Sequence, residues 1–168
     1  MTSRPAGPSA PAGGQLNVVD GLAQLAFVVY GMIELRAAEH DLSLTQARLL
    51  GVLRDRTPTM NELARLLGLD KSSVTGLVDR AERRGLVTRT PSAGDRRAVL
   101  AGLTDEGRSL VSQAAASFGA DLTAMLDLLA PADRELLPGI VSRLLVAYAA
   151  RHGVDLFAGL GTQVIAPD

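Results

Sequence analysis

Apolar residues recur every three or four positions along most of this chain, which is the spacing of one face of an α-helix. The first such stripe runs from Leu16 to about Ala38 and comprises Leu16, Val19, Leu22, Leu25, Ala26, Val29, Ile33 and Ala37. Further apolar side chains lie off this stripe, namely Phe27, Val28, Tyr30 and Met32. A helix that is apolar on more than one face is usually buried between partners, so the pattern predicts a helix with neighbours on several sides.

Two shorter helices are predicted next. The first extends from Thr45, as its N-cap, to about Asp55, and its apolar positions are Leu49, Leu50, Val52 and Leu53. In the second, Thr59 and Glu62 have the spacing of a capping box, in which each residue bonds the other's backbone N–H. Gly68 is expected to end that helix, because glycine adopts the left-handed conformation of a helix C-terminus without steric cost.

A fourth helix and a hairpin follow. Asp70 is placed to cap a helix that extends to about Arg84, and Gly85 is expected to end it. Leu86–Thr90 and Ala98–Leu103 have the character of two short strands. The link between them, residues 91–97, contains turn residues and two arginines, so the pair is predicted to be a hairpin with a basic tip.

The last part of the chain returns to helical spacing. Thr104 and Asp105 begin a helix of about six turns. Pro131 suits the first turn of a final helix, which is expected to reach about Arg151 and to end at Gly153. Pro138-Gly139 falls inside that final helix, where a proline is expected to kink or break it.

The segment from Met60 to Arg80 has the internal spacing of a helix-turn-helix unit. Ala64 is small, as the crossing of two helices requires, and Gly68 permits the backbone to bend between them. The apolar residues that would hold the two helices at a fixed angle are Leu63, Leu67, Val74 and Leu77. A basic hairpin directly after this unit strengthens the interpretation as a winged helix-turn-helix.

Composition narrows the class of protein. Of the 168 residues, 47% are apolar and only 3% aromatic, so the core must be aliphatic, and Leu and Ala favour helices. There is no cysteine, and the two histidines, His40 and His152, lie far apart in sequence. We therefore expect no metal site, no cofactor and no disulfide.

Localisation is also predicted from composition. The runs without charge are shorter than the ~20 residues that span a bilayer. Residues 1–14 contain Pro, Gly, Ala and Ser but no apolar stretch, so they do not have the pattern of a signal peptide. Both observations favour a cytoplasmic protein that makes no membrane contact.

Charge is distributed unevenly along the chain. The net charge is −1, yet Lys71–Arg97 contains seven basic and three acidic side chains, a net charge of +4, which leaves −5 on the rest. A basic patch on a nearly neutral protein is typical of a surface that binds phosphate. On charge alone, an ordinary solvated surface explains the patch equally well.

The fourth helix is predicted to read DNA. Val74, Leu77, Val78 and Ala81 would face inward, so the opposite face would enter the major groove, where base edges are distinguishable. The candidate DNA-binding residues on this helix are Lys71, Ser72, Ser73, Thr75, Gly76, Arg80 and Arg83. The alternative for the two serines is ordinary polarity at a helix N-terminus.

The hairpin tip is the second candidate contact, through Asp95, Arg96 and Arg97. Arginine suits a narrow and strongly negative minor groove. Asp95 is placed to pair with Arg97 and hold it extended, in a geometry that is specific when it is bidentate. The alternative is a surface ion pair that contributes ~0 to 1 kcal/mol.

These stretches together resemble the MarR (multiple antibiotic resistance regulator) family of winged helix-turn-helix transcription regulators. The resemblance rests on Leu44-Thr45-Gln46, on the run from Leu63 to Thr75, on Leu77-Val78-Asp79-Arg80, on Glu82-Arg83-Arg84-Gly85-Leu86-Val87, and on Asp95-Arg96-Arg97 with Leu103-Thr104 and Gly107. It covers residues 44–107, and the flanking helices match the family in length and order only. Gly76 departs from the pattern, because many relatives have a long side chain facing DNA at that position.

The resemblance implies a fold that is mainly α with a small β-hairpin wing, in which the first and last helices form the body of a homodimer. The implied segments are a flexible tail (1–14), an N-terminal dimerisation helix (15–40), a winged helix-turn-helix DNA-binding lobe (41–104), C-terminal dimerisation helices (105–152) and a C-terminal tail (153–168). The implied partner is double-stranded DNA with an inverted-repeat operator. Repression is the usual mode of action in the family.

The family also implies a small aromatic or lipophilic effector that weakens DNA binding. The candidates for its pocket are Tyr30, His40 and Arg48, which are polar groups in or near the first two helices. The alternative is that Tyr30 lies at the edge of the core and that His40 is an ordinary loop residue.

Two other functions remain to be compared with DNA binding. An enzyme would need an activated nucleophile, an acid–base pair or a metal, and the chain offers no cysteine, no histidine beside a partner and no glycine-rich phosphate loop. A helical interaction protein would use the winged unit on another protein. Only DNA binding would weaken steeply with salt, because counterions are released from phosphate.

Overall fold

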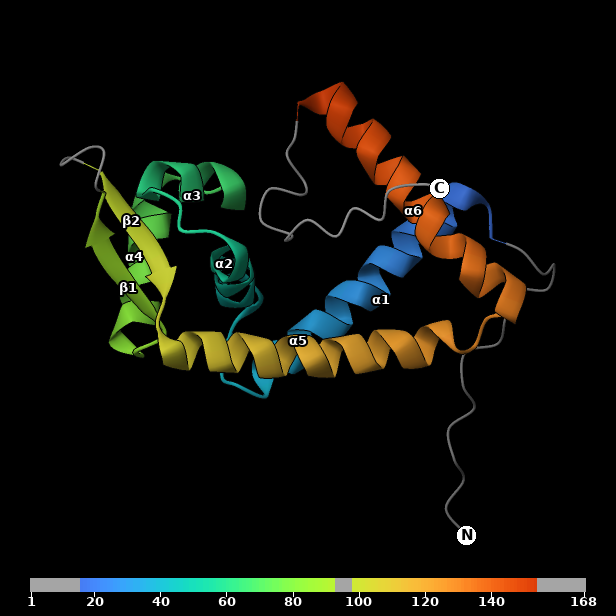
Figure 1. Cartoon of the computed structure of the whole chain (residues 1–168), viewed down its shortest axis with the longest axis horizontal. Helices are drawn as coiled ribbons and strands as arrows, with labels where there is room; N and C mark the ends of the chain where they lie inside the picture. The colour runs from blue at the N-terminus through green and yellow to red at the C-terminus, as the bar shows by residue number, and fades with distance from the viewer. Residues whose placement is uncertain (1–15, 93–97, 154–168) are drawn as a thin grey trace, which may run out of the picture.

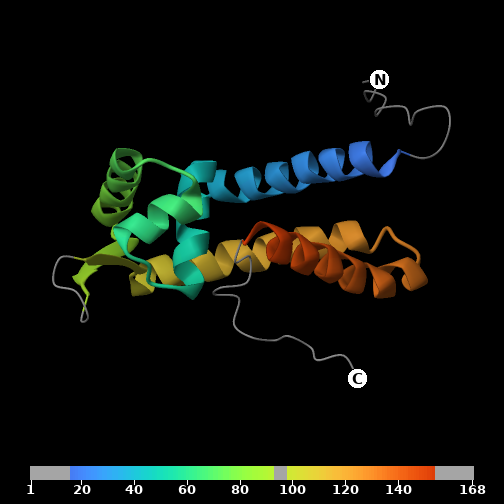
Figure 2. The same cartoon turned by 90° about the horizontal axis from the view of Figure 1, so that it is seen from above.

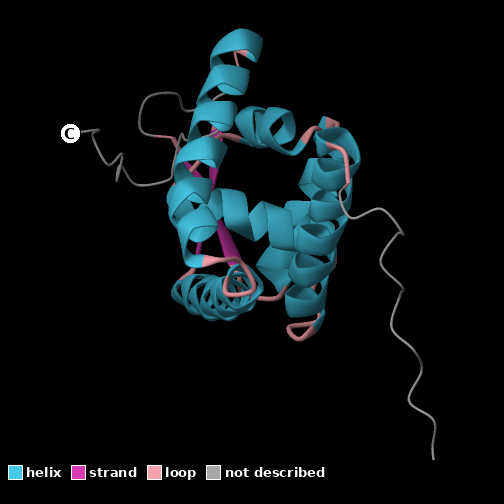
Figure 3. Ribbon diagram, turned by 90° about the vertical axis from the view of Figure 1, so that its right-hand side faces the viewer, coloured by secondary structure: helices cyan, strands magenta, loops and turns pink. Residues whose placement is uncertain are grey.

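The computed structural model describes residues 16–92 and 98–153 of the chain. Six helices and two strands follow one another in this part, in the order α1 (Val18–Ala38), α2 (Leu44–Asp55), α3 (Met60–Leu67), α4 (Lys71–Arg83), β1 (Val87–Pro91), β2 (Val99–Leu103), α5 (Asp105–Leu126) and α6 (Pro131–His152). Figures 1 and 2 show α2 to α4 and the hairpin gathered as a lobe at one end, while α1, α5 and α6 extend away from it. This is the predicted fold class, mainly helical with a single hairpin (Figure 3).

Side-chain caps fix where the lobe helices begin. Thr59 and Glu62 form the predicted capping box at α3, where the Thr59 N–H donates to Glu62 Oε2 over 2.8 Å. At α2 the predicted N-cap, Thr45, is wrong. Ser43 occupies that position, because its hydroxyl and the Gln46 side chain form a second capping box across the first turn.

The turn between α3 and α4 has the backbone that the sequence predicts. Gly68 ends α3 with φ of 66°, in the left-handed region, and Asp70 caps α4 two residues later. Gly85, with φ of 72°, follows the last turn of α4 and redirects the chain into the hairpin. The two helices are therefore held at a fixed angle by a short and fully specified turn.

The hairpin is antiparallel, and its register pairs Val87 with Leu103 and Pro91 with Val99. Both strands begin one residue later than predicted, since Leu86 and Ala98 lie before the ladder. The Ala101 N–H donates to the carbonyl of Pro58 over 2.9 Å, so the segment before α3 lies along the outer edge of β2. The wing is thereby joined to the lobe by backbone hydrogen bonds.

Gly107 allows α5 to begin close against the end of α4. A Cβ atom at this position would lie 2.0 Å from the carbonyl oxygen of Leu86, which is backbone. That same oxygen accepts a hydrogen bond from the Thr104 N–H over 3.1 Å. Only glycine fits this close approach, and it sets the direction in which the long helix leaves the lobe.

The buried core belongs almost entirely to the lobe. Its largest fully buried side chains are Leu49, Leu50, Leu63, Val74, Val78 and Val87. Ala37 is the one buried residue of α1, and α6 has none. Many large apolar side chains of these two helices are exposed instead, among them Val19, Leu22, Phe27, Tyr30, Leu136, Ile140, Leu144 and Tyr148.

The exposed surface of α1 bears on the question of membranes. By length and composition this helix is apolar enough to cross a bilayer, with a mean hydropathy of 1.6 over 18 residues, a property that counting charge-free runs overlooks. Its last turn is nevertheless tied to another helix, because Arg36 pairs bidentately with Asp121 of α5. The helix is therefore part of the folded unit that includes α5.

Of the two outcomes expected at Pro138, the break is wrong, since α6 is one helix from Pro131 to His152, and the kink stays a prediction. A proline inside a helix removes one N–H donor and leaves the carbonyl four residues earlier without its partner. No residue of α6 is buried, so water can hydrate that carbonyl and the loss is tolerated. Pro131 in the first turn and Gly153 at the C-terminus (φ 61°) are as predicted.

Candidate nucleic-acid interface

Helix α4 separates its apolar and polar side chains cleanly. Val74 and Val78 are fully buried, and Leu77 and Ala81 are nearly so. The opposite face is exposed at Lys71, Ser72, Ser73, Thr75, Arg80 and Arg83, while Gly76 is half-buried. The structure thus places all seven predicted α4 residues outside the core and on one helix, where a single groove of DNA would meet them.

Hydroxyl groups at the start of α4 are already engaged. The carboxylate of Asp70 accepts from Ser72 Oγ at 2.5 Å, from Ser73 Oγ at 2.6 Å and from the Ser73 N–H at 2.8 Å. These bonds hold the pKa of Asp70 well below its usual range, so the group stays ionised. Thr75 Oγ1 likewise donates to the carbonyl of Lys71 over 2.8 Å. With their protons used in this way, the three hydroxyls present acceptor lone pairs, which suit amino groups on base edges rather than phosphates.

Arg80 forms no ion pair in the described part of the chain, and neither do Lys71 and Arg83, the other exposed cations of this face. One of its terminal nitrogens, Nη1, lies 3.4 Å from the point where a Cβ of residue 76 would be. Gly76 therefore leaves room that the guanidinium of Arg80 occupies. Gly76 departs from the family pattern because it has no long side chain, and the side chain of Arg80, one helical turn later, lies in the space beside it.

Arg89 of β1 is a candidate site residue that the sequence analysis missed. Its guanidinium pairs with Asp79 over 2.6 Å and with Glu82 over 2.5 Å, and it donates to the carbonyl of Thr75 over 3.3 Å. These contacts join the hairpin to α4 and neutralise two carboxylates on it. The sequence contains a signal for this contact. Asp79 and Glu82 are three residues apart and so share a helix face, where together they can bind a nearby arginine.

The predicted tip residues, Asp95, Arg96 and Arg97, lie outside the described residues, so their contact with DNA stays a prediction. The base of the loop is described. There the Ser92 N–H donates to the carbonyl of Ala98 over 2.9 Å, one step beyond the last pair of the ladder. The loop therefore starts from a closed hairpin.

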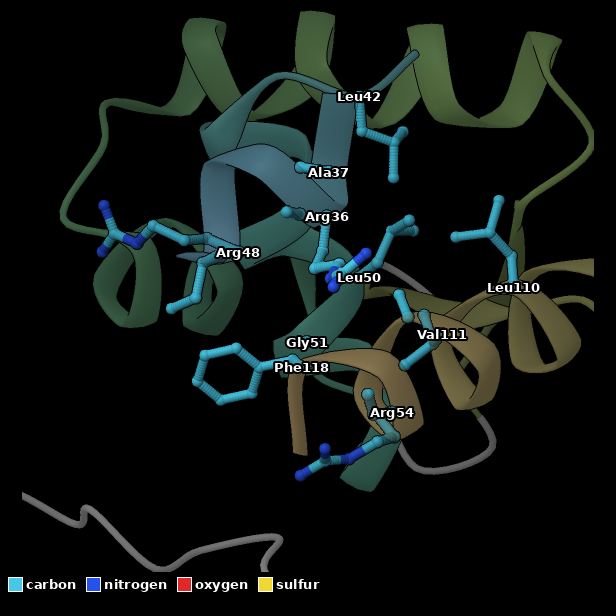
Figure 4. Close-up of a pocket in the computed structure, with 14 residues that line it drawn as sticks. Arg36, Ala37, Leu42, Arg48, Leu50, Gly51, Arg54, Leu110, Val111 and Phe118 are labelled. Atoms are coloured by element: carbon cyan, nitrogen blue, oxygen red, sulfur yellow. The ribbon is translucent and has the colours of Figure 1, made fainter. Parts of the chain in front are cut away.

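A pocket of about 290 Å³ lies between α1, α2 and α5 (Figure 4). Its walls are mostly aliphatic and include Ile33, Ala37, Leu42, Leu50, Val111 and Phe118. Of the three predicted effector residues, only Arg48 lines it. Tyr30 lines a separate hollow along α1, and His40 lies in the turn after α1, so the structure does not bring the three together.

Three arginines surround the pocket, and they differ in how they are paired. Arg36 forms two bonds of 2.6 Å with Asp121, which lower the pKa of that carboxyl, and it also pairs with Glu39. Arg54 is paired with Asp55. Arg48 has only a long contact of 3.4 Å to the carbonyl of Leu67, so it retains donors for a ligand.

The turn between α1 and α2 connects this pocket to α4. Arg84, which ends α4, donates to the carbonyls of Asp41 and His40 over 2.7 and 2.8 Å. Asp41 has φ of 54°, an unusual conformation for a residue other than glycine, and the next residue, Leu42, lines the pocket. A movement of this turn would therefore displace Arg84 at the end of α4. No group of three or more metal-ligating side chains gathers within residues 16–92 and 98–153.

Comparison with protein families and curated proteins places this geometry among known regulators. A model of the MarR family matches residues 40–98. The organic hydroperoxide resistance transcriptional regulator of Bacillus subtilis is 30% identical over 99 residues, which are 54% of this chain and 67% of that protein. The HTH-type transcriptional repressor NicR of Pseudomonas putida is 35% identical over 77 residues, 45% of this chain and 49% of its own length. For the first curated relatives the match spans between 49% and 60% of their length.

Solved structures share the fold over a larger part of the chain. RV1404 from Mycobacterium tuberculosis is 28% identical with a TM-score of 0.68, and the match covers 82% of this chain and 93% of that one. The wild-type apo form of MarR from E. coli has a TM-score of 0.69 at 22% identity and covers 79% of this chain and 99% of its own, which shows the fold alone. The curated relatives named above are transcription regulators.

Proposed function

The chain belongs to the MarR family of transcription regulators, and on this premise we propose that it is a cytoplasmic homodimer that represses transcription from an inverted-repeat operator in double-stranded DNA. The observation that carries the proposal is the exposed face of α4, where acceptor hydroxyls and the unpaired Arg80 lie together while Arg89 neutralises the acidic groups nearby. A helix of this kind fits the major groove. The basic hairpin tip would reach the adjacent minor groove.

The dimer is supported by the surface of α1 and α6. Their apolar side chains find no cover within the described chain, and they are too many for the exposed patch of a few hundred Å² that a soluble monomer normally carries. A second copy supplies the same apolar faces in return. Two recognition helices related by a two-fold axis would then bind half-sites about 34 Å apart, on one side of the duplex.

The pocket supports release of DNA by a small aromatic or lipophilic effector. We propose that the effector is an aromatic carboxylate, because the walls are apolar and Arg48 offers an uncommitted cation. One relative of the same fold, NadR, has been solved in complex with 4-hydroxyphenylacetate, a compound of this class. That compound and benzoate are suitable first probes.

The proposal is tested by selecting bound sequences from random duplexes and measuring their affinity by fluorescence anisotropy over a salt series. Binding should weaken with salt by roughly 0.9 in log–log slope for each phosphate neutralised, and the selected site should be a palindrome. Arg80→Ala should weaken binding at least tenfold, the scale of one good base or phosphate contact of about 1.4 kcal/mol or more.

Arg151→Ala, in the last turn of α6, is the matched control for loss of an exposed arginine. The two variants together separate the DNA-binding function from the alternative. Affinity that does not change with salt, or no selected duplex at all, would favour the alternative in which the winged unit binds another protein.

A further inference from the structure

A second hollow, of about 380 Å³, lies between the end of α2, the hairpin and the start of α5. Its polar lining residues are Arg54, Arg56, Thr57, Thr88, Thr90 and Arg108, together with the carboxylate of Asp55. Side chains alternate along a strand, and Arg89 faces α4, so Thr88 and Thr90 face the opposite side of the hairpin. The hollow therefore lies on the side of the hairpin away from α4, and it shares Arg54 with the pocket that Arg48 lines.

Arg56 is poorly satisfied in this hollow. Its Nε is buried and has no hydrogen-bond partner, and among the described residues it is the one buried side-chain nitrogen or oxygen in this condition. Nor does Arg56 form an ion pair there, whereas its neighbour Arg54 is held by Asp55 and Arg108 by Asp105. A buried N–H on a charged group costs free energy unless an acceptor meets it, and Arg56, which lines this hollow and a neighbouring one beside α2 and α3, has no acceptor in the described chain.

Three exposed threonine hydroxyls are the other uncommitted polar groups of the hollow. Within the described part of the chain, the hydroxyls of Thr57, Thr88 and Thr90 have no hydrogen-bond partner. Gly102 forms part of the wall between them, and a Cβ there would lie 3.3 Å from Cγ2 of Thr57. The absence of a side chain at residue 102 keeps the hollow open on that side.

We propose that this hollow is a binding site for an oxyanion of the phosphate type, carried by a small phosphorylated molecule. Three arginines and one aspartate give the lining a net charge of +2. The carboxylate is already bound by Arg54, so the guanidinium of Arg56 and the three threonine hydroxyls remain to donate to a ligand. A phosphate has enough acceptor oxygens to bond a guanidinium and several hydroxyls at once. This proposal does not depend on the effector pocket or on DNA binding.

The site is tested by isothermal titration calorimetry of the full chain with inorganic phosphate and with pyrophosphate, at constant ionic strength maintained with chloride. Wild type should bind pyrophosphate with a dissociation constant of about 1 mM or lower. Arg56→Gln should weaken that affinity at least about tenfold, because it removes both the charge and the unpaired donor. Thr88→Val, which keeps the β-branched shape preferred in a strand, should weaken it about threefold and keeps the test valid if Arg56→Gln fails to fold.

Arg65→Gln, an exposed arginine of α3, is the matched control and should leave the affinity within about twofold of wild type. Absence of binding to either anion at about 10 mM would overturn the proposal, as would equal weakening in Arg56→Gln and Arg65→Gln. A duplex that displaces the bound pyrophosphate would identify the DNA backbone as the source of the phosphate. Uptake of pyrophosphate by the protein–DNA complex would identify a free small molecule.

Discussion

Replacing Arg89 with methionine should weaken operator binding about 2- to 20-fold while changing the stability of the fold only slightly. The side chain of Arg89 is 23% exposed, and those of its partners Asp79 and Glu82 are 47% and 41% exposed. Ion pairs as exposed as these contribute ~0 to 1 kcal/mol each. The free energy of unfolding should therefore fall by no more than about 2 kcal/mol.

The expected effect on DNA follows from charge. Arg89, Asp79 and Glu82 together carry −1, and methionine changes that to −2 on the helix that approaches the phosphates. An added unit charge about 10 Å from a phosphate costs roughly 0.4 kcal/mol at a dielectric constant near 80 and roughly 1.7 kcal/mol near 20. These energies correspond to about 2-fold and about 20-fold in affinity.

Fluorescence anisotropy at a fixed salt concentration measures this change, and circular dichroism reports whether the fold is intact. Adding Asp79→Asn and Glu82→Gln to Arg89→Met removes the two carboxylates. This triple variant distinguishes the effect of negative charge on DNA binding from the effect of losing the contacts that position α4. If charge dominates, the triple variant, whose three residues carry no charge, binds DNA at least as tightly as wild type; if the contacts of Arg89 position α4, its binding stays weak. Arg134→Met, which breaks the exposed pair with Asp127, is the matched control. Wild-type affinity in a folded Arg89→Met protein would refute both explanations of the role of Arg89, the one by charge and the one by positioning of α4.

Four further outcomes are expected. Gly107→Ala should lower the free energy of unfolding by about 3 kcal/mol and the melting temperature by roughly 6 to 12 °C, because the new Cβ meets the backbone oxygen of Leu86 at 2.0 Å; calorimetry measures this, and an unchanged melting temperature would contradict it. Arg84→Gln should leave DNA affinity within about threefold of wild type but reduce the release caused by 4-hydroxyphenylacetate; equal release would remove the link through the α1–α2 turn. Arg97→Ala should weaken operator binding strongly and lower the salt slope by roughly 0.9, and equal affinity at the same salt would exclude the wing tip. Deleting residues 1–38 should give an insoluble or unfolded product, and a soluble, folded monomer would disprove the dependence on a dimer.

The elements of the lobe could be predicted because their signals are local. A capping box joins residues three apart, so Thr59 with Glu62 is visible in the sequence, and so is the left-handed glycine at Gly68. The same rule locates Ser43 with Gln46, and the choice of Thr45 failed because threonine is itself a favoured cap two residues later. Local rules thus identify a helix start to within a residue or two.

The contacts that organise the candidate sites are not local. Arg36 meets Asp121 across 85 positions, and Arg84 meets the carbonyl of Asp41 across 43. A charged residue in sequence has many possible partners, and only the packing of α1 against α5, and of the α1–α2 turn against the end of α4, selects among them. The effector candidates Tyr30 and His40 were chosen for polarity near the first two helices, and polarity does not reveal which way a side chain faces.

The division between core and flanking helices suggests where regulation must act. The lobe buries its own apolar side chains, while α1 and α6 leave theirs exposed, so the lobe is complete within one chain, and in the proposed dimer a second copy completes the remainder. The pocket lies where these two parts meet, with walls from α1, α2 and α5. A ligand in this pocket contacts both the lobe and the flanking helices α1 and α5. Its binding energy can therefore alter the angle between lobe and dimer body, and with it the separation of the two recognition helices, without disturbing the fold of either part. An operator with half-sites at a fixed spacing would be sensitive to that angle.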